Sequence, residues 1–103
     1  MATYSRVTPV GARLIPAATV VKLISTETPR QGWRVVNTTA HTLMVMIVEG
    51  GAPAPTRTEL LAQYDYKVPA GEPVADGASG GPDIYATWLE DAATGTLYPK
   101  EIG

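Results

Sequence analysis

The sequence predicts a small all-β domain: an antiparallel sandwich or barrel of about six to seven strands, with an extended N-terminal arm and at most one short helix. Three observations predict this class. The chain has 103 residues, enough for one domain. Its 10 glycines and 9 prolines are dispersed and divide it into short runs. These runs are rich in threonine, valine, isoleucine and tyrosine, which favour pleated sheets. We expect residues 1–16 to form the arm and residues 17–103 the folded domain.

The arm is predicted from its chain breakers. Pro9, Gly11 and Pro16 interrupt any helix, and the apolar side chains between them are scattered. Ordering such a segment costs about 1–2 kcal/mol of backbone entropy per residue, which an isolated monomer has no evident contact to offset. We therefore expect the arm to order on a neighbouring subunit. The candidate partner-binding residues are Arg6, Val7, Val10, Arg13, Leu14 and Ile15.

Three strands are predicted in the first half of the domain. Residues 19–25 form the first, with Val21 and Leu23 on one face. Residues 33–37 form the second. Residues 43–49 form the third, and its first six residues are all apolar, so both of its faces must be covered. The second face needs either another layer of this chain or another subunit.

The second half begins with a helix signal. Thr56 and Glu59 have the spacing of a capping box, which predicts a short helix over residues 56–63. Alternating patterns then predict strands at residues 64–68 and 84–89. We expect a hairpin connection at residues 90–95 and a closing strand at 96–102. The expected core residues are Trp88, Ile84, Val21, Leu23, Val35 and Val45.

The sequence carries no catalytic signature, and we expect no enzymatic activity. The chain has no cysteine, which excludes disulfides and thiolate chemistry. Its one histidine, His41, lies in a predicted hairpin turn at residues 37–42 and is interpreted as exposed. A serine or cysteine nucleophile would need that histidine beside it.

No metal or cofactor site is predicted. Glu72, Asp76 and Asp83 flank a glycine-rich loop, and calcium prefers such oxygen ligands. However, their order matches no calcium-binding loop, so they are interpreted as solvated acids. Residues 77–81 lack the lysine and the following helix of a phosphate-binding loop.

The charge and hydropathy patterns exclude other classes of partner. The net charge of −2 argues against binding to nucleic acid, and the longest apolar run, of six residues, is too short for a membrane helix. The N-terminus does not resemble a secretory signal, so we expect synthesis in a cytoplasm. Residues 1–60 are net basic and residues 61–103 net acidic. Folding either leaves two oppositely charged patches, which could dock head to tail, or interleaves and cancels them.

Four segments follow one another in a recognisable order. They are Arg30-Gln-Gly-Trp-Arg-Val-Val-Asn-Thr-Thr39, Tyr66-Lys-Val-Pro-Ala-Gly-Glu72, Asp83-Ile-Tyr-Ala-Thr-Trp88 and Gly95-Thr-Leu-Tyr-Pro-Lys-Glu101. In this order they resemble the small all-β virion proteins of tailed bacteriophages, in which a strand that ends in Asn-Thr or Asn-Ser is paired with a Pro-Ala-Gly turn and a Tyr-Ala strand. The resemblance covers about residues 30–101.

The resemblance implies a non-enzymatic structural protein of a virion, made in the host cytoplasm. The expected role is capsid decoration, with the major capsid protein or other virion subunits as partners and a homo-oligomeric arrangement on the particle. A head-to-tail or tail accessory role is an alternative. A carbohydrate- or receptor-binding module of a fibre or tail is another, which a cluster of exposed aromatic residues would favour. A small hydrolase or lyase would need a pocket with paired carboxylates.

Overall fold

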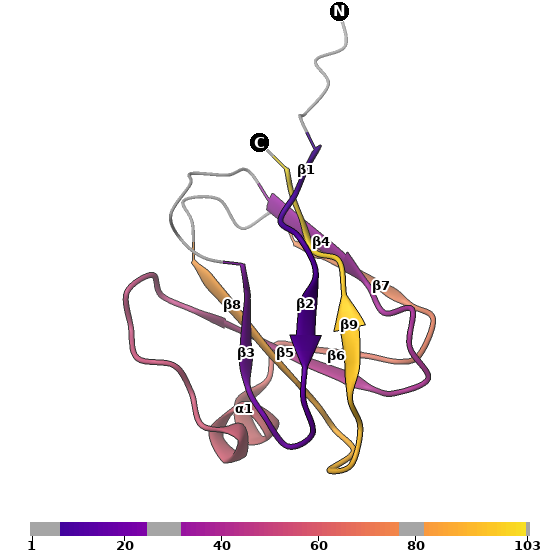
Figure 1. The fold of residues 1–103 in the computed structure, drawn as a ribbon. Coiled ribbons are helices and arrows are strands. Elements are labelled where there is room, and N and C mark those ends of the chain that lie inside the picture. The colour runs from indigo at the N-terminus through magenta and orange to yellow at the C-terminus, as the bar shows by residue number, and fades with distance from the viewer. Residues whose placement is uncertain (1–6, 25–31, 77–81, 103) are drawn as a thin grey trace, which may run out of the picture.

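The computed structural model describes residues 7–24, 32–76 and 82–102, which form ten short strands and one helix (Figure 1). The all-β class with a single short helix is confirmed. The elements, in chain order, are β1 (Val7–Pro9), β2 (Arg13–Ile15), β3 (Val21–Ile24), β4 (Gly32–Val36), β5 (Leu43–Val48), α1 (Arg57–Gln63), β6 (Tyr66–Val68), β7 (Pro73–Asp76), β8 (Asp83–Trp88), β9 (Gly95–Leu97) and β10 (Lys100–Ile102).

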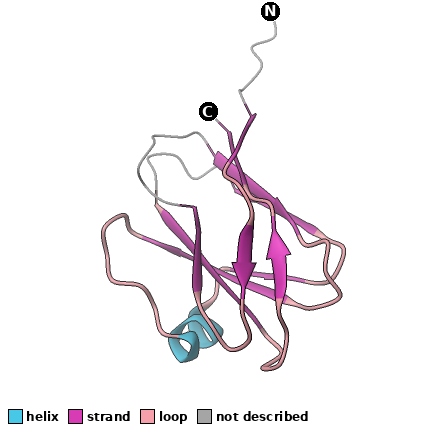
Figure 2. Ribbon diagram, in the orientation of Figure 1, coloured by secondary structure: helices cyan, strands magenta, loops and turns pink. Residues whose placement is uncertain are grey.

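The strands form two four-stranded antiparallel sheets and a two-stranded ribbon (Figure 2). Sheet I has the order β1-β10-β4-β7, and sheet II has the order β3-β8-β5-β6. The ribbon pairs β2 with β9. There are more strands than predicted for three reasons: the expected arm contains β1 and β2, β7 was not predicted, and the expected closing strand divides at Tyr98 and Pro99.

The two ends of the chain pair along most of their length, from β1 on β10 to β2 on β9. Between these two ladders the Val10 N–H donates a hydrogen bond of 3.0 Å to the Pro99 carbonyl. The register shifts by one residue from the Val7–Ile102 pair to the Arg13–Leu97 pair, which places one extra residue on the N-terminal side. Gly11, at φ +104°, lies at this bulge, where a side chain would be strained.

The expectation that the N-terminal arm lacks contacts within the monomer is wrong for residues 7–15. Ile15 is fully buried in the core, and Val10 packs against it. Local sequence patterns do not predict these contacts, because the residues that pair with this segment lie 80–95 positions further along the chain. Residues 1–6 lie outside the described part of the chain.

The main core lies between the sheets. Five of the six predicted core residues are buried, and the sixth, Val21, is partly buried and packs against them. Strand β8 is buried at all six positions, so it forms the centre of the molecule. The buried cluster comprises Ile15, Leu23, Ile24, Trp33, Val35, Leu43, Val45, Val68, Val74, Ile84, Ala86, Trp88, Ala93 and Leu97.

The helix covers the second face of sheet II. Leu60 of α1 is fully buried and packs with Met44 and Tyr85. The predicted capping box is present: the Glu59 N–H donates to Thr56 Oγ1, and the Thr56 N–H donates to Glu59 Oε1, both at 3.1 Å. This chain's own helix therefore covers Met44 on the second face of the apolar third strand, whereas Met46 and Val48 are partly buried there.

Asn37 organises the corner between the two sheets. It is fully buried, and its Nδ2 donates to the carbonyls of His41 at 2.7 Å and Val68 at 3.0 Å. Its backbone N–H donates to the Glu72 carbonyl at 2.9 Å, and its carbonyl accepts from the Gly71 N–H at 2.7 Å. The Asn-Thr and Pro-Ala-Gly segments thus form a single hydrogen-bonded corner.

The two predicted hairpin connections are corrected by this arrangement. Residues 37–42 lead from β4 in sheet I to β5 in sheet II, and residues 89–94 lead from β8 in sheet II to β9 in the ribbon. Neither loop joins strands that pair with each other. Turn residues predict where a chain reverses but not which strand it then meets.

Candidate docking surface on sheet I

Sheet I has one buried face and one exposed face. Along β4, Trp33 and Val35 point into the core, whereas Arg34 and Val36 are exposed. On β7, Val74 is buried between exposed neighbours. This alternation is typical of an antiparallel sheet that packs on one side only. We call the exposed side of sheet I the outer face.

Two cations lie directly opposite each other on the outer face. Arg34 on β4 pairs in register with Lys100 on β10, and both side chains are exposed. Like charges in this position are destabilising, by up to about 1 kcal/mol. The ion pairs among the described residues involve Lys22, His41 and Arg57, so no described carboxylate compensates Arg34 or Lys100.

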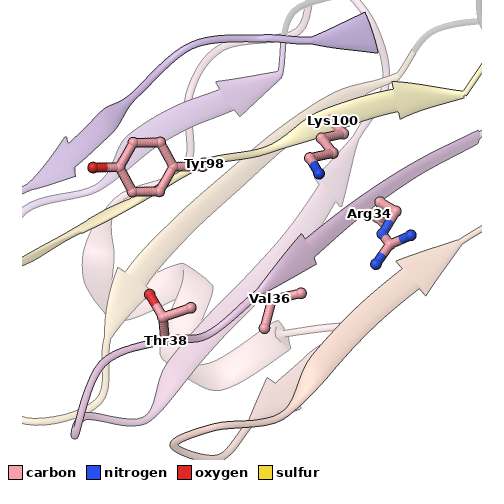
Figure 3. A pocket seen from close by; sticks show the side chains of 5 residues that line it. All are labelled: Arg34, Val36, Thr38, Tyr98 and Lys100. Carbon is pink, nitrogen blue, oxygen red and sulfur yellow. The ribbon is translucent and has the colours of Figure 1, made fainter. Parts of the chain in front are cut away.

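A shallow groove surrounds this pair. Figure 3 shows its five lining side chains, which come from the neighbouring strands β4 and β10 and from the residues next to them: Arg34, Val36, Thr38, Tyr98 and Lys100. The groove holds about 140 Å³. Pockets for small molecules usually hold about 300–1,000 Å³, so this groove suits one or two side chains better than a whole ligand.

The groove also has apolar walls. Tyr98 is 62% exposed and Val36 is 37% exposed, and both line it. Tyrosine is enriched in protein–protein contacts because its ring provides apolar area and its hydroxyl provides a hydrogen bond. The arrangement can therefore bind a group that is anionic at one end and apolar beside it.

The predicted partner-binding residues that the structure describes do not all lie on the surface. Ile15 is in the core and Val10 packs against it, whereas Leu14 is 58% exposed. Val7 of β1 pairs with Ile102 of β10, and Arg13 Nη1 donates to the Ala12 carbonyl at 3.2 Å. Arg6 lies outside the described residues.

The sequence analysis did not identify this candidate docking surface. The alternation of residues 33–36 indicates that Arg34 and Val36 share an exposed face. This alternation could have identified the β4 part of the groove. The position of Lys100 and Tyr98 beside it could not be predicted, because it depends on β10 pairing with β4 across more than 60 residues.

His41 is less exposed than predicted. Its ring lies edge-on to Trp88, with the ring centroids 5.8 Å apart, and its Nδ1 is 3.9 Å from Glu90 Oε1. The same Glu90 oxygen accepts the Thr42 N–H at 2.8 Å. These contacts hold the loop between β4 and β5 in place. The residues they bring to the imidazole are Trp88 and Glu90, neither of which is a serine or cysteine nucleophile.

The acidic residues considered as metal ligands have different environments. Asp83 is buried and lies 3.7 Å from Lys22 Nζ, whereas Glu72 is exposed. Asp76 ends β7, and the adjoining residues 77–81 lie outside the described part of the chain. Among the described residues, no three histidine, cysteine or acidic side chains gather as a metal site would require.

Folding brings together parts of the basic and acidic halves. Arg57 Nη1 lies 2.8 Å from Asp91 Oδ1, and Lys22 lies near Asp83, so two of the cations are compensated across the halves. Arg34 of the basic half and Lys100 of the acidic half form no ion pair with a described carboxylate, and the same holds for Arg13 and Lys67. Arg34 and Lys100 differ from these two in lying directly opposite each other.

The exposed aromatic side chains are few in the described part of the chain. Trp33 and Trp88 are fully buried, and the exposed ones are Tyr64, beside the end of α1, and Tyr98, on the outer face.

Across the described residues, no helix has the length and apolar character needed to cross a bilayer. No family model, curated protein or solved structure matches this chain.

Proposed function

We propose that the chain is a non-enzymatic structural protein of a phage-like virion that decorates the capsid by docking the outer face of sheet I on the shell. One observation carries the docking role. In the described part of the chain, sheet II is covered by α1 on its second face, whereas sheet I has an exposed face with an uncompensated Arg34–Lys100 pair. The virion role itself rests on the resemblance in residues 30–101.

The closed core supports a subunit that folds before it assembles. Both ends of the described chain pair within the domain, and the core residues come from both sheets and the ribbon. A shell offers many equivalent positions to such subunits. Multiple weak contacts can then hold a layer of subunits on a particle.

A head-to-tail or tail accessory position is the second form of the same proposal, since it would use the same face. A carbohydrate-binding module is less supported. It would need clustered exposed aromatic rings, whereas Tyr64 follows α1, Tyr98 lies between β9 and β10, and both tryptophans are buried.

The proposal is tested on virions produced by the genome that encodes this chain. Particles with and without the gene are purified and compared by mass spectrometry and cryo-electron microscopy. We expect the chain in the purified particles, extra density on the shell, and saturable rebinding of purified protein to particles that lack it. Density confined to the tail or its junction would favour the accessory role. Absence of the chain from purified particles would overturn the proposal.

A further inference from the structure

We propose that the groove on the outer face binds the carboxylate side chains of an acidic segment of a partner protein, with Arg34 and Lys100 holding the carboxylates and Tyr98 and Val36 packing beside them. This inference rests on the proposed docking role and names the chemistry of the partner. The occupant is a protein segment rich in aspartate or glutamate.

The register of the sheet carries the first step. Residues directly opposite each other in antiparallel strands have Cβ atoms about 4.5–5.5 Å apart, so the Arg34 and Lys100 side chains start from neighbouring points on one face. Their repulsion is relieved by an anion placed between them. A guanidinium can bind a carboxylate through two parallel hydrogen bonds, and the lysine ammonium adds a third.

The size and walls of the groove carry the second step. A volume of about 140 Å³ accepts one or two acidic side chains but not a typical small-molecule ligand. Tyr98 and Val36 offer apolar contact to the methylene groups of such a side chain or to its neighbours. A free inorganic anion would leave these apolar walls unused.

The charge pattern argues against nucleic acid as the occupant. A protein that tracks a phosphate backbone neutralises about 6–10 phosphates, whereas this groove presents two cations on a chain with a net charge of −2. A second copy of the chain is also less favoured, because Glu90-Asp91 is the only pair of adjacent acidic residues in the sequence. In each copy Asp91 pairs with Arg57, and Glu90 accepts the Thr42 N–H and lies near His41.

The test is an NMR titration of the 15N-labelled full chain with an octaglutamate peptide at low salt. We expect the largest shifts at the amides of Arg34, Val36 and Lys100. Arg34→Glu should weaken binding about tenfold or more, as expected for the loss of a charge-assisted hydrogen bond. Its melting temperature should be no lower than that of the wild type, because the new carboxylate lies opposite Lys100.

Lys67→Glu is the matched control. Lys67 is also exposed on a strand, but on β6 of sheet II, and its replacement changes the net charge equally. It should change the affinity less than about twofold, since it lies on the other sheet. Equal losses in the two variants would show attraction to net charge only and overturn the inference. Chemical-shift changes confined to amides outside the groove would also overturn the inference. The same holds if octalysine, a DNA duplex or inorganic phosphate binds equally well at the same amides.

Rebinding to particles separates this inference from the proposed function. If Arg34→Glu rebinds particles like the wild type, the groove is not the docking site, although the decorating role stands. If the wild type binds octaglutamate in the groove but is absent from virions, the virion role is overturned. The groove then binds an acidic partner that is not a virion protein. Dimerisation of the free protein that is lost in Arg34→Glu would make a second copy the occupant and overturn the acidic partner.

Discussion

The indole Nε1 of Trp88 donates a hydrogen bond of 2.9 Å to the carbonyl of Ile15, and both side chains are fully buried. Thr94 Oγ1 donates to the same carbonyl at 3.3 Å. Trp88 ends the central strand β8, whereas Ile15 ends β2 near the start of the chain. This contact makes the N-terminal segment part of the core instead of an appendage to it.

Replacing Trp88 should separate the packing of its ring from its hydrogen bond. Trp88→Ala should lower the free energy of unfolding by about 3–5 kcal/mol, because it leaves a large cavity in the core. Trp88→Phe keeps an aromatic ring and should cost less. Urea unfolding followed by circular dichroism measures both. A loss below about 1 kcal/mol for Trp88→Ala would contradict the burial of the ring.

Ile15 and Leu14 are neighbours with opposite environments, and they test whether the N-terminal segment is integral. Ile15→Ala should cost about 2–5 kcal/mol, since Ile15 is fully buried. Leu14→Ala should change stability by less than about 0.5 kcal/mol, because Leu14 is 58% exposed. Similar melting temperatures for the two variants would show that the segment is a detached arm after all.

Asn37→Ala should destabilise the corner between the sheets. It removes the donor to the Val68 and His41 carbonyls and the acceptor for Thr39, which leaves buried polar groups unpaired. We expect a loss of about 3 kcal/mol in unfolding free energy. Thr38→Ala is the control and should be nearly neutral, because Thr38 is exposed. Equal effects would mean that the corner does not depend on the amide.

The capping box is tested by two threonines of the same helical region. Thr56→Ala removes the side chain that accepts the Glu59 N–H and should cost about 1 kcal/mol. Thr58→Ala, within α1 and exposed, should be neutral or slightly stabilising because alanine has the higher helix propensity. Chemical denaturation of both variants measures the difference, and a larger cost at Thr58 would contradict the cap.

Gly95 is confined by its neighbours. A Cβ at this position would lie 3.1 Å from Trp88 Cζ2 and 3.1 Å from Thr39 Cγ2. Because the indole ring is held by the core, Gly95→Ala should cost about 1–3 kcal/mol. Adding Thr39→Ser removes the Thr39 methyl group, which is one of the two close contacts of the new Cβ, and keeps the hydroxyl. The double variant should therefore recover part of the lost stability in a thermal melt. No loss in Gly95→Ala would show that Trp88 can move.

Local patterns predicted the elements that depend on neighbouring residues. The capping box at Thr56 and Glu59 predicted α1, because a helix start is decided by groups three residues apart. The alternation of residues 84–88 predicted that Ile84 and Trp88 lie in the core, because side chains of a strand alternate between two faces. The all-β class followed from many such short runs.

Tertiary structure decided everything that depends on strand pairing. The Asn-Thr and Pro-Ala-Gly segments could be read as two turns, but their union around Asn37 required β4 to lie beside β7. Residues 7–15 belong to the domain because they pair with β10 and β9 and because Ile15 enters the core, and both contacts join parts of the chain that lie far apart in sequence. For the same reason, the composition showed that Arg34 and Lys100 were present, but only the antiparallel pairing of β4 with β10 placed the two like charges side by side.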